Sequence, residues 1–473
     1  MIKLHEQTAQ TQLFENSPIL SAVLKLAVPT VISQIILVIY NIADTYFISL
    51  TDNTAMITAV TVCMPAFMFL SAISNLFGVG GASVISRALG KKDADNAKRA
   101  SSFAFWGCAV TTFAYSLLAW LFMDVLVNAL GGSVPDVHIN ACLYLMVTVV
   151  IGGAATSLNA LLGHLVRSEG RSVHAGFGIA LGGVLNIALD PLFMFVILSP
   201  GNEVLGAAIA TSLSNLIATC YFLVLIFIER HNTVIDLRPA SSSLSDGIPK
   251  DVLLTGLPAC LMTLCENISY AVLDNLMAAT QIINCQAGIG VAKKINMLAH
   301  CMVRGMAQGV LPLIGYNYSA GNFKRMRSAV ILSTAISIAL ATLSMIICLL
   351  FSRQLVGIFL EHDARSLEYG AEFLRILCIG GPFSACAYAF ISFFQAVGES
   401  LKSLILALLR KGILDIPLML ILVRIYPIYG IVWATPIADF FCCVISIILF
   451  IRFFRHLTSR SDSSEQNVEP VTV

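Results

Sequence analysis

The chain has 473 residues, of which 58% are hydrophobic and only 12% are charged. Soluble domains carry about twice that charged fraction, so the composition excludes an ordinary soluble protein and indicates a protein with many membrane spans. The formal net charge of +1 gives no reason to expect nucleic-acid binding.

Residues 1–19 form a predicted cytoplasmic segment. They lack the basic start, apolar core and cleavage site of a signal peptide. Twelve mainly apolar runs of about 20 residues or more follow. They cover residues 20–48, 56–86, 100–127, 139–163, 173–198, 205–229, 252–280, 286–316, 328–352, 372–396, 402–424 and 430–453.

Basic residues alternate between the loops. Loops after odd-numbered runs are nearly free of Lys and Arg, whereas those after even-numbered runs are basic. The basic positions include Lys91, Lys92, Arg167, Arg171, Arg230, Arg238, Lys250, Lys324, Arg325, Arg327 and Lys402. Basic loops stay in the cytoplasm, so we predict an all-α multi-pass protein of the inner membrane with both termini cytoplasmic.

The polar stretch 231–250 predicts a cytoplasmic connector between two units. The predicted domains are an N-terminal six-helix bundle at 20–230, a C-terminal six-helix bundle at 251–456 and a disordered tail at 457–473. A displacement of 229 residues places Pro29 on Pro258 and Gly80 on Gly309. Six plus six helices in one orientation predict a pseudo-two-fold axis along the membrane normal and alternating access.

The stretch Pro29–Asp44 is apolar except for four residues within one ~120° sector of a helix, namely Gln34, Tyr40, Asn41 and Asp44. A carboxylate in hydrocarbon is costly, so Asp44 is a functional-site hypothesis. The alternative interpretation is that Asp44 marks a helix end. The same choice applies to Asp190, which shares a helix face with Asn186 and precedes a proline.

Run seven places Glu266 near its middle, with Asn267 beside it and Tyr270 and Asp274 on successive turns. We expect these four residues to bind substrate, and the alternative is a structural pair of Glu266 with Lys293 or Lys294. Met64 and Met68 suit a promiscuous apolar cavity or ordinary packing. The other cations inside predicted runs, Arg304, Arg410 and Lys411, indicate internal pairing or a hydrated cavity.

Ordered segments now become recognisable, among them PTVISQIILVIYNIADTYFI, GVGGASVISRALGKKDADNAKRA, RSEGRSVHAGFGIALGGVLNIALDPLF and YGIVWATPIADF. Over nearly its whole length the chain resembles the multidrug and toxic compound extrusion (MATE) family. The resemblance implies a secondary antiporter that exports organic cations in exchange for protons or sodium ions. It also implies a coupling network, whose matching positions are Gln34, Tyr40, Asp44, Asn186, Asp190 and Thr211.

The family's second cation site uses an acidic residue on helix 7, which Glu266 matches. Some members add an aspartate on helix 10, and its absence here argues against a sodium site in the C-terminal bundle. We therefore expect protons to be the main coupling ion, with sodium as the alternative, and no cofactor or bound metal.

Other classes of function lack their motifs. No GxxxxGK[ST] indicates a nucleotide-driven motor, no HExxH or GxSxG indicates a membrane enzyme, and no repeated filter indicates a pore. A lipid-intermediate flippase or another solute transporter of the same superfamily is the alternative, but its cavity is expected to be basic and this one acidic. The predicted partners are drugs, dyes, biocides and membrane lipids, and the predicted state is a monomer.

Overall fold

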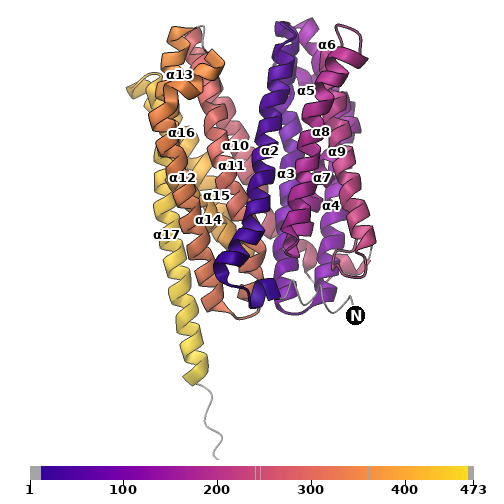
Figure 1. The fold of residues 1–473 in the computed structure, drawn as a ribbon, viewed down its shortest axis with the longest axis vertical. Helices are drawn as coiled ribbons and strands as arrows, with labels where there is room; N and C mark the ends of the chain where they lie inside the picture. Colours follow the sequence, from indigo (N-terminus) through magenta and orange to yellow (C-terminus); the bar gives the residue numbers. More distant parts are fainter. Residues whose placement is uncertain (1–11, 240, 246, 361–362, 467–473) are drawn as a thin grey trace, which may run out of the picture.

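The computed structural model describes residues 12–239, 241–245, 247–360 and 363–466, and these are helical apart from turns and the connector. Figure 1 shows two groups of helices side by side, joined through the middle of the chain. The N-terminal bundle consists of α2 (Ile19–Ser49), α3 (Thr54–Gly90), α4 (Ala94–Leu121), α5 (Met123–Ala129), α6 (Pro135–Leu145), η1 (Met146–Ile151), α7 (Gly153–Ser168), α8 (Ser172–Pro191), η2 (Leu192–Ile197) and α9 (Glu203–Ile228).

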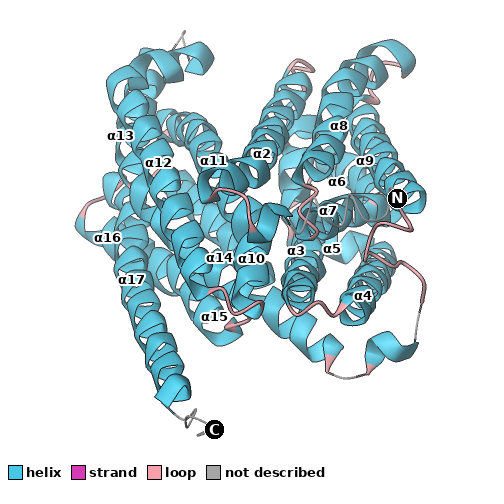
Figure 2. Ribbon diagram, turned by 60° about the horizontal axis from the view of Figure 1, so that its bottom comes forward, coloured by secondary structure: helices cyan, strands magenta, loops and turns pink. Residues whose placement is uncertain are grey.

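The C-terminal bundle follows a short 3-10 turn, η3 (Ser241–Leu244), in the connector. Figure 2 shows its helices grouped apart from those of the first bundle. It consists of α10 (Ile248–Ala279), α11 (Ile283–Ser319), α12 (Phe323–Leu360), α13 (Ala364–Ile379), α14 (Gly381–Val397), α15 (Ser400–Leu408), η4 (Leu409–Leu414), α16 (Asp415–Ile425) and α17 (Tyr429–Gln466).

Nine helices in the described part of the chain are long and apolar enough to cross a membrane, and two bent pairs raise this number to eleven. The remaining predicted run, 402–424, is the eleventh in chain order and forms α15, η4 and α16. It carries Arg410, Lys411 and Asp415, so its composition is more polar than that of the other runs. The predicted all-helical fold is confirmed.

Two predicted runs are broken rather than continuous. The run at 139–163 bends by 50° where α7 begins, beside Gly152, and the run at 372–396 bends by 43° beside Gly380. A Cβ on Gly152 would collide with Ser212 of α9, so the bend also brings two helices together. The hydropathy pattern gave no sign of either bend, because glycine is compatible with an apolar run.

The bundles contact each other near one end, which we call the basic end because the loops with Lys91, Arg171 and Lys324 lie there. α3 crosses α10 so closely that a Cβ on Gly256 would overlap the carbonyl oxygen of Leu76. Likewise Gly309 of α11 lies against the backbone of α2. We call the opposite end of the bundles the neutral end.

Residues 12–17, which precede α2, brace the basic end. The buried ring of Phe14 stacks on Tyr316 of α11, with 4.9 Å between centroids, and its far edge lies against Gly170 of the N-terminal bundle. Arg325 of α12 donates hydrogen bonds to the carbonyls of Phe14 and Ser17, each 2.6 Å long. The first segment of the chain therefore touches both bundles.

The connector follows the surface of the N-terminal bundle. Trp106 of α4 donates a 2.9 Å hydrogen bond to the carbonyl of Leu237, and Glu169 accepts hydrogen bonds from Thr233 and Val234. At the other end of the chain α17 continues to Gln466. The described part of the predicted disordered tail is therefore helical, and residues 1–11 and 467–473 lie outside the described residues.

Candidate functional site

A cavity lies between the bundles in their basic halves. Its wall comes from α3, α7, α10, α11 and α14. The lining residues are Asn75, Val79, Ala82, His164, Arg167, Ala259, Met262, Thr263, Arg304, Ala307, Gln308, Leu311, Pro312, Tyr388, Ile391, Ser392 and Gln395. The lining contains two arginines and no carboxylate, so the prediction of an acidic lining is wrong for this cavity. Glu266 and Tyr270 line a second, smaller cavity inside the C-terminal bundle, together with Lys293, Arg410 and Lys411.

Polar residues inside the N-terminal bundle form a separate cluster. The amide of Asn186 on α8 donates 3.2 Å hydrogen bonds to Asp190 and to Thr211 of α9. Asp190 is fully buried, and the span that contains it continues to Ile197. The alternative of an outer helix end is thereby excluded for Asp190.

Asp44 faces this cluster from α2. Its carboxylate lies close enough to Asp190 for their charges to interact, and the rings of Tyr40 and Tyr144 lie within reach of both. Tyr40 also packs against Gly183 of α8, 3.4 Å from the place of a Cβ. Since α2 continues to Ser49, Asp44 lies inside the helix rather than at its end.

The cluster is incompletely bonded. Asp44 Oδ1, Asp190 Oδ2 and Asn186 Oδ1 are buried, and none accepts a hydrogen bond from a described residue. Buried acceptors without donors are costly, whereas a proton or a hydrated cation would satisfy them. Gln34 is also buried, but ten residues of helix separate it from Asp44, about 15 Å. Gln34 therefore lies outside the cluster, whereas the other residues of the predicted network lie close together.

Glu266 has a partner that the sequence did not indicate. Arg304 of α11 donates a 2.6 Å hydrogen bond to its carboxylate, and Tyr388 of α14 lies 3.4 Å from its other oxygen. The proposed pair with Lys293 or Lys294 is wrong in its partner, because Lys293 binds Asp274 instead. The structure therefore places Glu266 and Asp274, which the sequence suggested as substrate-binding residues, in two ion pairs.

The remaining predicted substrate residues do not meet in the cavity. Asp274 is half-exposed and lies beside Lys293, while Asn267 donates to the carbonyl of Thr263 in its own helix. Met64 and Met68 are partly buried in the N-terminal bundle. Among the described methionines, Met262 lines the cavity in their place.

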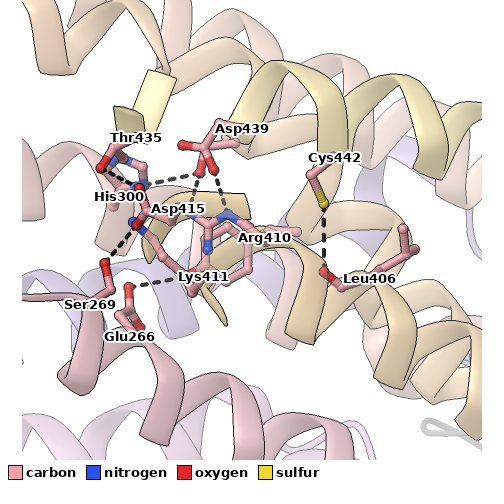
Figure 3. Close-up of polar contacts among 12 residues, drawn as sticks. Glu266, Ser269, His300, Leu406, Arg410, Lys411, Asp415, Thr435, Asp439 and Cys442 are labelled. Atoms are coloured by element: carbon pink, nitrogen blue, oxygen red, sulfur yellow. Dashed lines mark hydrogen bonds and ion pairs between the residues drawn. The ribbon is translucent and has the colours of Figure 1, made fainter. Parts of the chain in front are cut away.

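Buried ion pairs fill the centre of the C-terminal bundle (Figure 3). Arg410 binds Asp439 of α17 at 2.7 Å, and Lys411 binds Asp415 at 3.0 Å. Hydroxyl groups of Ser269 and Thr435 donate to the same Asp415 carboxylate, at 2.6 and 2.9 Å. The predicted internal pairing of these cations is confirmed.

Sequence reasoning missed Asp415, Asp439 and Tyr388. The two aspartates carry the same signal as Asp44, a carboxylate within an apolar run. Tyr388 has no such signal, because a tyrosine in an apolar segment is ordinary. Its importance comes from the fold, which places its ring 4.1 Å from the guanidinium of Arg410 and its hydroxyl beside Arg304.

One cluster among the described residues has the composition of a metal site. Asp124, His138 and Cys142 offer ligand atoms within 4.8 Å of one another near the neutral end. His138 already makes a 3.0 Å contact with Asp124, and Asp124 is largely exposed. This ion pair accounts for the arrangement without a metal.

Two helical bundles with a cavity between them, and with charged residues buried inside each bundle, define a helical membrane transporter. The MatE family profile matches residues 29–192 and again residues 258–421, and the two matches are displaced by 229 residues. The chain therefore belongs to the MatE family of transporters, which are not enzymes, and its halves are repeats of one unit.

The chain is similar to the multidrug export protein MepA of Staphylococcus aureus strain MRSA252, with 28% identity over 442 residues, 93% of this chain and 95% of that protein. MepA of Staphylococcus haemolyticus is 27% identical over 448 residues, 94% of this chain and 96% of that protein. Among solved structures, the outward-facing conformation of a multidrug resistance MATE transporter gives a TM-score of 0.87 at 24% identity, over 95% of this chain and 98% of that one.

Another solved structure of the same fold is described as a transporter of the MOP superfamily from Pyrococcus furiosus whose binding pocket has reverse polarity. It gives a TM-score of 0.85 at 24% identity, over 94% of this chain and 98% of that one. At this level of identity the likeness concerns the fold alone.

Proposed function

We propose that the protein is a multidrug exporter that expels lipophilic organic cations in exchange for protons. The observation that carries the proposal is the pair of carboxylates Asp44 and Asp190, each of which has one buried oxygen without a hydrogen-bond donor among the described residues. The MepA proteins, named as multidrug exporters, support the substrate class. Membrane lipids surround a monomer in this proposal, and no cofactor takes part.

The coupling step follows from the two carboxylates. Two negative charges close together inside an apolar bundle repel each other, so one proton shared between them is favourable. Loss of that proton toward the cytoplasm leaves charges that need water or a cation. Sodium is the alternative ion, because oxygen atoms of Asn186 and Thr211 suit it as well.

The driving force is sufficient for uphill export. An inward pH difference of one unit is worth ~1.4 kcal/mol per proton, and a potential of 100 mV adds ~2.3 kcal/mol per charge. Exchange of two protons for one monocation therefore uses both the pH difference and the membrane potential. One-for-one exchange moves no net charge, so it gains nothing from the potential.

Topology is part of the proposal. The basic end, with Lys91 and Lys324, is cytoplasmic by the positive-inside rule, so the bundles are packed together on the cytoplasmic side. In a cysteine-free background, a membrane-impermeant thiol reagent added from outside should label Asp52→Cys and not Lys92→Cys. Labelling of position 92 alone would reverse the orientation.

A second candidate is a transporter of anionic solutes, including a flippase for lipid intermediates. Arg167 and Arg304 in the cavity wall favour it. The two candidates differ in a simple assay with purified protein in liposomes. A fluorescent lipophilic cation should be driven uphill by an imposed pH gradient at zero sodium. Transport of anionic dyes alone, or a strict sodium requirement, would overturn the proposal.

A further inference from the structure

Arg167 is a buried charge without an acidic partner among the described residues. It lies on the last turn of α7, only 2% exposed, and lines the cavity between the bundles. Its Nη1 lies 3.4 Å from Nδ1 of His164, but Nε and Nη2 are buried without an acceptor among the described residues. An arginine keeps its charge even when buried, so this site lacks a negative partner.

Nearby carboxylates bind other groups, although Glu169 Oε2 is itself buried without a hydrogen bond from a described residue and lies 3.8 Å from Nε of Arg171. Glu169, two residues along the chain, is turned toward the connector, where it binds Thr233 and Val234. Glu266 is bound to Arg304 and Tyr388. The side-chain amide of Gln395, also on the cavity wall, likewise has a buried Nε2 without an acceptor. The cavity thus presents donors for which the described residues supply no acceptor.

Most of the remaining wall is apolar, including Val79, Met262, Leu311 and Ile391. A ligand that fits has an anionic group beside an apolar body. We propose that Arg167 and Gln395 form a binding site for a carboxylate-like anion at the basic end of the cavity. The anion is either part of the transported molecule, which is then a zwitterion, or a free small anion that binds beside it.

This inference rests on the proposed export function and extends its substrate class. It also explains how a cation exporter uses a cavity with two arginines. Charge-assisted hydrogen bonds to an anion replace the water that the guanidinium lost on burial. The positive part of a zwitterion then lies farther toward the neutral end, away from Arg167.

A matched pair of dyes tests the proposal. Rhodamine 123 is a cationic methyl ester, and rhodamine 110 is the corresponding free carboxylate. Binding of each to the purified full chain in nanodiscs is measured by fluorescence anisotropy. Loss of a charge-assisted hydrogen bond should weaken rhodamine 110 about 10- to 100-fold in Arg167→Gln, while rhodamine 123 changes less than about twofold.

Controls separate binding from folding. Arg171→Gln removes the same charge four residues away, outside the cavity, and should leave both dyes unaffected. Retained affinity for rhodamine 123 shows that Arg167→Gln is folded. If that variant does not fold, Gln395→Leu replaces it, with an expected loss of about 2- to 10-fold for rhodamine 110 alone.

Replacing chloride by gluconate distinguishes the two sources of the anion. If free chloride fills the site, it competes with the carboxylate of rhodamine 110, so rhodamine 110 should bind more tightly in gluconate in the parent protein and not in Arg167→Gln; if the anion belongs only to the transported molecule, gluconate should change nothing. Equal changes for both dyes with no chloride effect would overturn the anion site while leaving the export function intact. Absence of binding and transport for both dyes in the parent protein would overturn the export function itself.

Discussion

The two bundles are repeats of one unit, yet they treat buried charge in opposite ways. In the N-terminal bundle, Asp44 and Asp190 have no basic partner among the described residues, and each leaves a buried oxygen without a donor. In the C-terminal bundle, Asp415 and Asp439 each bind a buried cation. Unpaired carboxylates can bind and release a proton, whereas paired ones hold helices together. The repeat thus contains one half with unpaired carboxylates and one half with paired ones, and in the proposed mechanism the first half serves coupling.

Asp44→Asn, in the N-terminal bundle, should have the largest effect. An amide cannot exchange a proton, so uphill export under a pH gradient should disappear, while dye binding stays within about twofold because the cavity does not include this residue. The measurement is dye efflux from liposomes with an imposed gradient. Uphill export by this variant would remove Asp44 from the mechanism.

Arg410→Ala tests the rigid half. Removal of one partner from a buried ion pair leaves the other charge unpaired, so unfolding should become easier by about 3–5 kcal/mol. Thermal unfolding in detergent measures the change. The double variant Arg410→Met with Asp439→Leu serves as the control and should recover most of the loss. If the single variant is as stable as the parent protein, the pair does not hold the bundle together.

Glu266→Gln tests whether a paired carboxylate of the C-terminal bundle acts on the substrate directly. The free carboxylate inferred from the sequence would attract dications more than monocations. Its pairing with Arg304 predicts instead a moderate loss, about 1 kcal/mol, that is equal for both classes of substrate. Affinities for a matched monocation and dication measure this. A selective loss of dication binding would show that the carboxylate acts on the substrate directly.

The smallest effect is expected for a variant of Glu169, a buried carboxylate outside the membrane-spanning helices. Burial raises its pKa above the usual 4.5, although its hydrogen bonds oppose the shift. A raised pKa means that the folded form holds the proton more tightly, so the contribution to stability is greatest below pH 4.5 and declines as the pH rises through the raised value. Glu169→Gln should flatten the dependence of the melting temperature on pH across this range. If the melting temperature of Glu169→Gln depends on pH as steeply as that of the parent protein, the pKa of Glu169 is not raised in the folded form.

Hydropathy predicted the all-helical membrane fold, and the 229-residue displacement predicted the repeat, because burial in lipid constrains composition strongly. They could not predict side-chain partners. α10 and α11 follow each other across a short turn, which made Lys293 the natural partner of Glu266. In the fold α10 packs mainly on α3, and α11 packs on α2. The rotation and tilt that bring Arg304 to Glu266 arise from these distant contacts, which a single sequence does not contain.

The prediction of an acidic lining for the cavity between the bundles was wrong for a related reason. A helical wheel shows which residues share a face, but not whether that face points to the neighbouring helix or to the space between bundles. For Asp44 and Asp190 the face points into the bundle. For Arg167, which the sequence placed only in a basic loop, the side chain points into the cavity.

Residues 12–17 give the resting protein a preferred state. Phe14 lies against Gly170 and Tyr316 in different bundles, so separation of the bundles at the basic end requires this segment to release one of them. Separation at the neutral end leaves it undisturbed. In the proposed alternating-access cycle, the energy of these contacts would enter one side of the conformational equilibrium only and would weight the population toward molecules that are closed at the basic end.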